Sequence, residues 1–226
     1  MTFGSASAIS LIIGDIGYAY WRGKQRERKI QAAFQPAAVL DPPHFVERPA
    51  IAKMVRSAIL SGTGNYDVIV GNHGTGKSTV VKKIAKETPG AVYVFIKPLT
   101  NINKAMTKAF IEALNWEEPQ ITWREAVLKT VFQSSANRRV PADNDNDNEP
   151  DFVRLLDDFE HFAAKYKAET GSPAVLVLDN TNVLIAKDPE ILDMLQDLAK
   201  TACDEDLYKV VFVCSDGTAP IRMEGK

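Results

Sequence analysis

The eight residues from Gly71 to Ser78 constrain the fold of this chain more than any other segment. They read GNHGTGKS and fill every fixed position of the pattern G-x-x-x-x-G-K-[ST]. A buried strand is expected just before them, at 66–70, and a helix just after them, from about Lys77 to Lys86. A phosphate-binding loop requires this context, because the helix aims its positive end at the anion. The segment therefore predicts a nucleoside triphosphate site in an α/β fold.

The residue types of this loop suit a triphosphate. Glycines at 71, 74 and 76 let the chain curl so that successive N–H groups face phosphate oxygens. Lys77 is expected to reach the β- and γ-phosphates, Ser78 to give its hydroxyl to Mg²⁺, and Thr79 to add an α-phosphate contact. All loop positions are therefore predicted to bind the nucleotide: Gly71, Asn72, His73, Gly74, Thr75, Gly76, Lys77, Ser78 and Thr79.

A second acidic motif ends a predicted buried strand further along the chain. Residues 174–180 read AVLVLDN, so Asp179 closes an apolar run and is expected to hold Mg²⁺ through water. Asn180 follows, where many ATPases have Glu. An amide orients water but cannot accept its proton, so we expect slow hydrolysis or a base from elsewhere. The candidates for that base are Asp188, Asp204 and Asp216.

A polar residue also follows the predicted strand at 208–214, which reads YKVVFVC. Ser215 fits a sensor of the γ-phosphate, and a simple strand-to-turn cap is the alternative interpretation. Lys77, Asp179, Asn180 and Ser215 together form the predicted catalytic set.

Apolar strands alternate with amphipathic helices along the chain, which indicates a mostly parallel sheet covered on both faces. We expect an α/β three-layer sandwich of the P-loop NTPase type over residues 45–226. Residues 1–44 are expected to form an apolar and basic segment with a proline-rich linker. Residues 141–150, PADNDNDNEP, are expected to be a flexible acidic loop.

The overall charge favours no polyanionic partner, since 27 basic and 29 acidic side chains nearly cancel. Nucleic acid is therefore not indicated. Two cysteines without metal-ligand spacing fit an intracellular protein. An apolar run at 6–21 precedes a basic cluster that ends at Lys29. A helix docked on the domain or a frayed end is one interpretation, and peripheral membrane association through residues 6–29 is the other.

The order of these motifs resembles that of AAA+ and STAND-type P-loop ATPases. Residues 45–49, FVERP, look like the FVGRE-type box that precedes the phosphate loop in archaeal ATPase, origin-recognition and STAND families. By that resemblance Phe45 and Val46 border the adenine. The LDN and CSDG segments are also similar to ATPase domains of fungal and oomycete Crinkler-like proteins and of a mitochondrial escape protein.

The resemblance covers about residues 45–217 and implies the strand order 5-1-4-3-2 with strand 5 missing. The chain stops at Lys226, before the fifth strand, arginine-finger region and helical lid of these families. We therefore expect either that the molecule is a fragment or that a neighbouring chain completes its site. A homo-oligomer or another protein partner is expected for the same reason.

Three functions are compatible with the sequence. The first is an ATPase that uses Mg²⁺. ATP is preferred to GTP because no NKxD motif follows a later strand, and NKAM at 103–106 has Met106 where the guanine-reading Asp belongs. The second is a nucleotide-dependent switch with very slow turnover. The third, a small-molecule kinase, would need an arginine-rich lid, for which Arg138 and Arg139 are the only compact candidates.

Overall fold

The structure is a computed structural model that describes residues 3–39, 48–62, 64–72, 74–117 and 151–215. The chain forms two compact units, which are described separately. The first comprises residues 1–29 and 117–150, and the second comprises residues 30–116 and 151–226. The helix predicted within 116–140 and the acidic segment 141–150 thus fall, apart from residues 116 and 117, outside the described residues.

In the first unit the described structure is mostly helix α1 (Phe3–Ala33), whose last turn belongs to the second unit. Tyr18, Tyr20 and Trp21 are exposed on it. The guanidinium of Arg22 lies 5.4 Å from the centre of the Tyr18 ring, and Lys24 Nζ lies 5.3 Å from that of Tyr20. None of the helices described here has a stretch long and apolar enough to cross a membrane.

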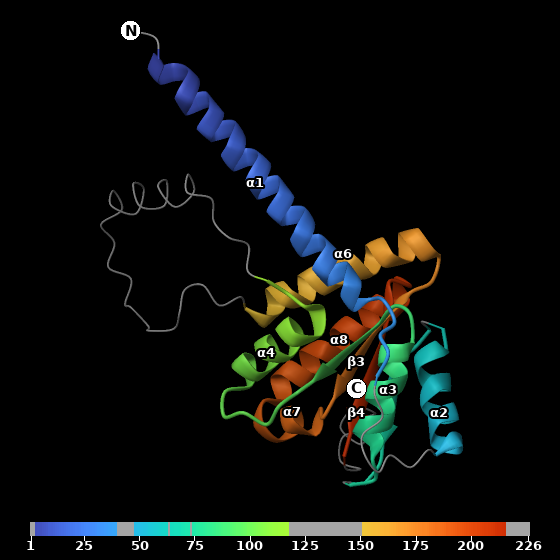
Figure 1. Cartoon of the computed structure of the whole chain (residues 1–226). Helices are drawn as coiled ribbons and strands as arrows, with labels where there is room; N and C mark the ends of the chain where they lie inside the picture. The colour runs from blue at the N-terminus through green and yellow to red at the C-terminus, as the bar shows by residue number, and fades with distance from the viewer. Residues whose placement is uncertain (1–2, 40–47, 63, 73, 118–150, 216–226) are drawn as a thin grey trace. The chain divides into compact units, whose positions relative to one another are not determined.

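The second unit is built on a parallel sheet in the order β1-β4-β3-β2 (Figure 1). Its strands are β1 (Asp67–Val70), β4 (Tyr208–Cys214), β3 (Ala174–Asp179) and β2 (Ala91–Phe95). Val70 pairs with Cys214, and Asp179 pairs with Val213 and with Phe95, so the carboxyl ends of all four strands lie at one edge. The order among the described residues confirms the 1-4-3-2 part of the predicted arrangement.

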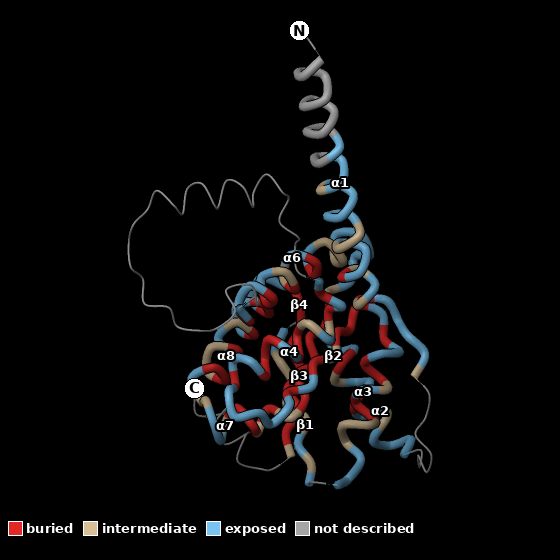
Figure 2. The backbone as a smooth tube through the Cα atoms, turned by 60° about the vertical axis from the view of Figure 1, so that its left-hand side comes forward, coloured by how far each residue is buried: buried red, intermediate tan, exposed pale blue. Residues whose placement is uncertain are grey.

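Helices cover both faces of this sheet, as the continuous burial of β3 and β4 requires. Helices α2 (Pro49–Leu60) and α3 (Lys77–Glu87) pack on one face, where Val177 and Val213 meet Val55 and Val81. The other face carries α4 (Ile102–Leu114), α6 (Phe152–Thr170), α7 (Asn182–Lys187) and α8 (Pro189–Asp204). Figure 2 shows the buried residues concentrated along the strands. The prediction of a three-layer sandwich is confirmed.

The residues at the start of the second unit are not detached from the fold but form part of its core. Ile30 and Phe34 are fully or almost fully buried in the core of the second unit. The Phe34 ring stacks on Phe159 at 5.7 Å and on Tyr166 at 5.9 Å between centroids. The boundary between residues 44 and 45 stays a prediction, but the end of the segment before it contributes to the core. Helix α7 was not predicted, since six residues carry too little periodicity.

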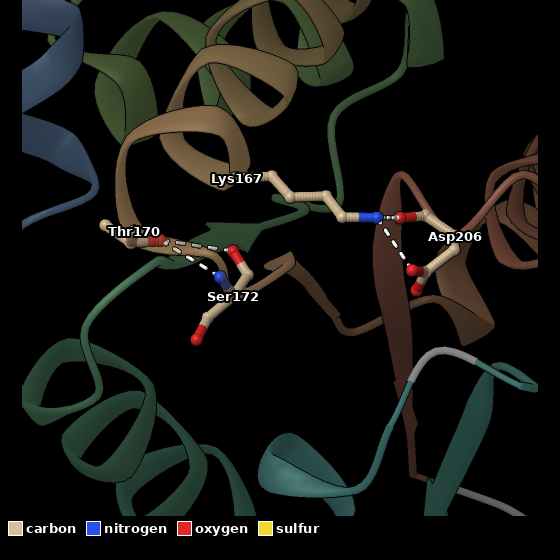
Figure 3. Close-up of polar contacts among 4 residues, drawn as sticks. All are labelled: Lys167, Thr170, Ser172 and Asp206. Atoms are coloured by element: carbon tan, nitrogen blue, oxygen red, sulfur yellow. Dashed lines mark hydrogen bonds and ion pairs between the residues drawn. The ribbon is translucent and has the colours of Figure 1, made fainter.

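Polar contacts tie the end of α6 to the turn before β4 (Figure 3). Lys167 Nζ donates to the Asp206 carboxylate at 2.7 Å and also to the Asp206 carbonyl. The Thr170 hydroxyl accepts from the Ser172 N–H at 3.2 Å. Exposed pairs of this kind contribute at most about 1 kcal/mol. The Lys167 contacts join α6 to the turn before β4, and the Thr170 contact lies in the turn between α6 and β3.

Candidate functional site

The loop between β1 and α3 has the backbone geometry that its glycines predict. Gly74 and Gly76 have φ of 78° and 77°, in the left-handed region that favours glycine. The Thr75 hydroxyl donates to the Asn72 carbonyl at 2.9 Å, which closes a turn inside the loop. Gly76 is also the N-cap of α3 and has no side chain that could cap the first turn. The N–H groups of that turn are therefore suited to an anion.

Lys77 lies back across its own loop. Its Nζ donates to the Gly71 carbonyl at 2.7 Å. A Cβ placed on Gly71 would come within 3.3 Å of Lys77 Cδ, so the glycine makes room for this side chain. Phosphate oxygens would offer the ammonium a stronger, charge-assisted partner than the carbonyl. The loop thus holds its cation close to the place where the sequence predicts the β- and γ-phosphates.

Asp179 ends β3 at the same edge of the sheet and is 2% exposed. Tyr93 of β2 donates its hydroxyl to Asp179 Oδ2 at 2.6 Å. Burial, and then the neighbouring Asp179 carboxylate, raise the pKa of Tyr93 far above its ordinary value, so the hydroxyl stays protonated and remains a donor. Sequence reasoning missed Tyr93. Its one signal was a hydroxyl-bearing residue within the otherwise apolar run AVYVFI.

Asn180 has a structural role that its sequence position did not reveal. Its φ is 70°, a left-handed conformation that asparagine tolerates better than most residues. Its N–H donates to the Val213 carbonyl at 3.0 Å, and its Nδ2 donates to the Ile96 carbonyl at 2.8 Å. Asn180 therefore links the ends of β4 and β2 across β3. Its predicted role in orienting the attacking water stays a prediction.

Ser215 follows β4, the strand between β1 and β3. This order places Ser215 between the phosphate loop and Asp179 along the edge, where a sensor would be needed. Among the alternative bases, Asp188 caps α8 by accepting from the Ile191 N–H at 3.4 Å. Asp204 ends α8, just before β4 starts, and so lies at the opposite edge of the sheet. Asp216 lies outside the described residues.

The segment ahead of the loop reaches it through an arginine. Arg48 is the N-cap residue of α2, and its Nη1 donates to the Thr75 carbonyl at 3.2 Å. Arg48 belongs to the FVERP segment, whose sequence does not indicate this contact. Phe45 and Val46, predicted to border the adenine, and His73 of the loop lie outside the described residues.

The oxygen donors at this edge fit a magnesium ion. Ser78 lines the same groove as Tyr93, and the Tyr93 hydroxyl donates to Asp179, so a hydroxyl and a carboxylate are both available at this edge. The described residues contain no group of three or more Asp, Glu, His or Cys that could cage a metal. Mg²⁺ does not require such a cage, because it is held by one or two protein oxygens together with phosphates and water.

Fold, loop and acidic strand end together define a P-loop NTPase. The model of the AAA ATPase domain family matches residues 47–213, which is most of the chain. The chain belongs to this family and contains a nucleotide-binding P-loop ATPase domain.

Other comparisons add little to this assignment. The chain is similar to a Walker-type ATPase of Pyrococcus abyssi at 13% identity with a TM-score of 0.48, over 84% of this chain and 51% of that one. The chain therefore spans about half the length of that solved structure. The comparison with curated proteins found no match.

Proposed function

We propose that this domain binds ATP with Mg²⁺ and hydrolyses it to drive or switch a conformational change. The observation that carries the proposal is the convergence, at one sheet edge, of a phosphate loop with a buried carboxylate held by Tyr93. A triphosphate needs cations and N–H donors at one end and a metal at the other. The family assignment supports nucleotide binding. The residues at this edge of the sheet support the more specific proposal that ATP is bound with Mg²⁺ and hydrolysed.

Each side chain of the site has a distinct task in this proposal. Lys77 leaves the Gly71 carbonyl and binds the β- and γ-phosphates. Ser78 and Asp179 would hold Mg²⁺, Asp179 through water. When bound, Mg²⁺ would neutralise charge that develops on the transferred phosphoryl group. Ser215 would report whether a γ-phosphate is present.

Adenine is the proposed base. Residues 103–106, the nearest approach to a guanine-reading motif, lie inside helix α4 rather than after a strand. Met106 is fully buried there and faces the core. The resemblance of residues 45–49 to an adenine-bordering box supports the same choice, with Phe45 and Val46 as the contacts.

Single-turnover hydrolysis of ATP, with and without Mg²⁺, tests the proposal. We expect Mg²⁺-dependent release of phosphate by the wild type and a loss of about a hundredfold or more in Asp179→Ala, since a single electrostatic stabiliser is worth that much. Lys108→Ala, an exposed change on α4, is the matched control. If ATP binds with Mg²⁺ but is not hydrolysed, the protein is the slow nucleotide-dependent switch that Asn180 suggests and not a hydrolase. Phosphate transfer to a nucleoside or another small molecule would instead identify a kinase.

Residues 6–29 are proposed to bind an anionic membrane surface. The exposed aromatic side chains of Tyr18, Tyr20 and Trp21 stand next to Arg22 and Lys24, the pairing found where amphipathic helices meet lipid headgroups. Co-sedimentation with vesicles of anionic or zwitterionic lipid tests this. Equal recovery with both vesicles, or with neither, would contradict it. A homo-oligomer or another protein partner stays a proposal, which sizing with and without ATP would address.

A further inference from the structure

A groove of about 650 Å³ runs along the free edge of the sheet beside β2. Helix α3 forms one wall and α4 the other, and Tyr93 and Phe95 of β2 lie between them. The volume falls within the range of about 300–1,000 Å³ that is usual for ligand sites. The groove lies next to the phosphate loop, since Ser78 and Thr79 line it, but most of its lining belongs to neither nucleotide nor metal in the proposal above.

The edge of β2 in this groove presents backbone groups in the spacing of a strand. Ile96 donates its N–H to the Asp179 carbonyl of β3, so the alternate residues Tyr93 and Phe95 direct their N–H and C=O groups outward. Within the described ranges, no strand pairs with this outer side. The segment that follows α1 crosses the start of β2, where the Phe34 carbonyl accepts from the Gly90 N–H, and continues along α3, where the Ala37 N–H donates to the Lys86 carbonyl. This segment also lines the groove, through Ala32, Ala33, Gln35, Ala37 and Val39. The outward groups of β2 are therefore placed to pair with an added strand.

The charge of the groove selects for an acidic ligand. Four lysines line it: Lys82, Lys83, Lys86 and Lys97. One acidic side chain, Glu112, lies among the lining residues, and it pairs with Lys97 at 2.6 Å. Lys82 and Lys86 are exposed on α3, along the wall that would face alternate side chains of an added strand.

The shape of the opposite wall leaves room for that strand. Ala109 and Ala113 of α4 line the groove with small side chains. Phe95 is 39% exposed, although it belongs to the sheet, and offers an apolar surface at the upper end. A nucleic acid would use the lysines, but it has no backbone that matches the N–H and C=O alternation of a strand edge.

We propose that this groove binds an extended, acidic peptide segment of a partner protein, which adds as a strand to the outer edge of β2. Main-chain pairing supplies affinity in this mode of recognition, and the lysines supply the preference for acidic side chains. Because Tyr93 lines the groove and also holds Asp179, the bound segment would lie beside the predicted metal site. The binding itself needs no nucleotide, so it can fail or succeed independently of the proposed ATPase.

Fluorescence anisotropy with the full chain and a labelled peptide of alternating threonine and glutamate, about six residues long as strands usually are, tests the proposal. We expect saturable binding that weakens with salt. A matched threonine–lysine peptide should not bind. The same acidic peptide with alternate amides N-methylated should lose at least tenfold in affinity, because it cannot pair with β2.

Charge reversal tests the site. The double change Lys82→Glu and Lys86→Glu, at exposed positions of α3, should weaken binding at least tenfold, and Lys108→Glu, outside the groove, should leave it unchanged. Thermal unfolding by circular dichroism checks that each variant folds, and Lys82→Gln with Lys86→Gln replaces the double variant if it does not. The proposal would be overturned if the acidic peptide does not bind, if both peptides bind equally, or if oligo-dT binds more tightly. It would also be overturned if the methylated peptide or the charge-reversed protein keeps full affinity.

Discussion

The polar residues at the amino ends of the strands differ in their contacts from those at the carboxyl ends. At the amino edge, Lys209 is 2% exposed, and its charge is satisfied by Asp67 at 2.5 Å, the Ser61 carbonyl at 3.2 Å and the Ser61 hydroxyl. At the carboxyl edge, Asn180 is left-handed and the loop glycines are too. The amino edge thus pairs its polar groups with each other, whereas the carboxyl edge carries a glycine loop whose following helix has no side chain capping its first turn. The difference separates residues that hold the fold from residues that are placed for a ligand.

The amino edge also explains how α2 is fixed. Ser61 follows the end of α2, Asp67 begins β1 and Lys209 lies in β4, so the cluster joins a helix to two strands. A buried cation of this kind is costly when its partner is lost. The contrast between the edges can therefore be measured as stability on one side and as ligand binding on the other.

The largest effect on stability is expected when the buried ion pair is broken from its exposed side. Asp67→Ala leaves Lys209 buried without its carboxylate and should lower the free energy of unfolding by about 2–3 kcal/mol. Lys209→Met keeps the apolar stem and leaves Asp67, whose side chain is 40% exposed, to hydrate, so its loss should be under about 1 kcal/mol. Urea unfolding of both variants measures the asymmetry. Equal losses would contradict this account of the amino edge.

Asn180 is expected to give an intermediate effect that depends on backbone rather than charge. Asn180→Glu puts an unfavourable residue at φ 70° and removes the donor to the Ile96 carbonyl, so stability should fall by about 1–2 kcal/mol. Asn180→Gly keeps the conformation and should lose less. The glycine variant is therefore the better test of whether the amide orients water. A stable Asn180→Glu protein would show that the left-handed link is dispensable.

Tyr93→Phe should produce the smallest change, and it should appear in metal binding. Without the Tyr93 hydroxyl, Asp179 loses one hydrogen bond, and the apparent affinity for Mg²⁺ in the presence of a fluorescent ATP analogue should drop about tenfold. Binding of that analogue in EDTA should not change. Tyr208→Phe, which removes a comparable hydroxyl bonded to Glu160 at 2.7 Å, is the matched control. Equal Mg²⁺ affinity in Tyr93→Phe and the wild type would remove Tyr93 from the site.

The sequence predicted those features that are local. The loop and the four strands follow from short patterns such as GNHGTGKS and AVLVLDN, which lie within a few residues of chain. The strand order was implied by the resemblance to AAA+ and STAND-type ATPases, and the sheet has it. The contacts of Tyr93 and Lys209 were not predicted, because their partners are 86 and 142 residues away in the sequence, respectively. These partners come into contact only after the strands pair. Lys209 lies within the predicted strand YKVVFVC, and nothing in that pattern indicates a buried ion pair. Arg48 meets Thr75 only once α2 has packed on α3.

The central claim is that Lys77 and its loop bind ATP. Isothermal titration of ATP into the wild type, Lys77→Ala and the control Lys108→Ala tests it most directly. We predict that Lys77→Ala weakens ATP binding by about a hundredfold, or about 2.7 kcal/mol, while Lys108→Ala and the unfolding midpoint stay unchanged. Unchanged ATP affinity in a folded Lys77→Ala protein would contradict the account.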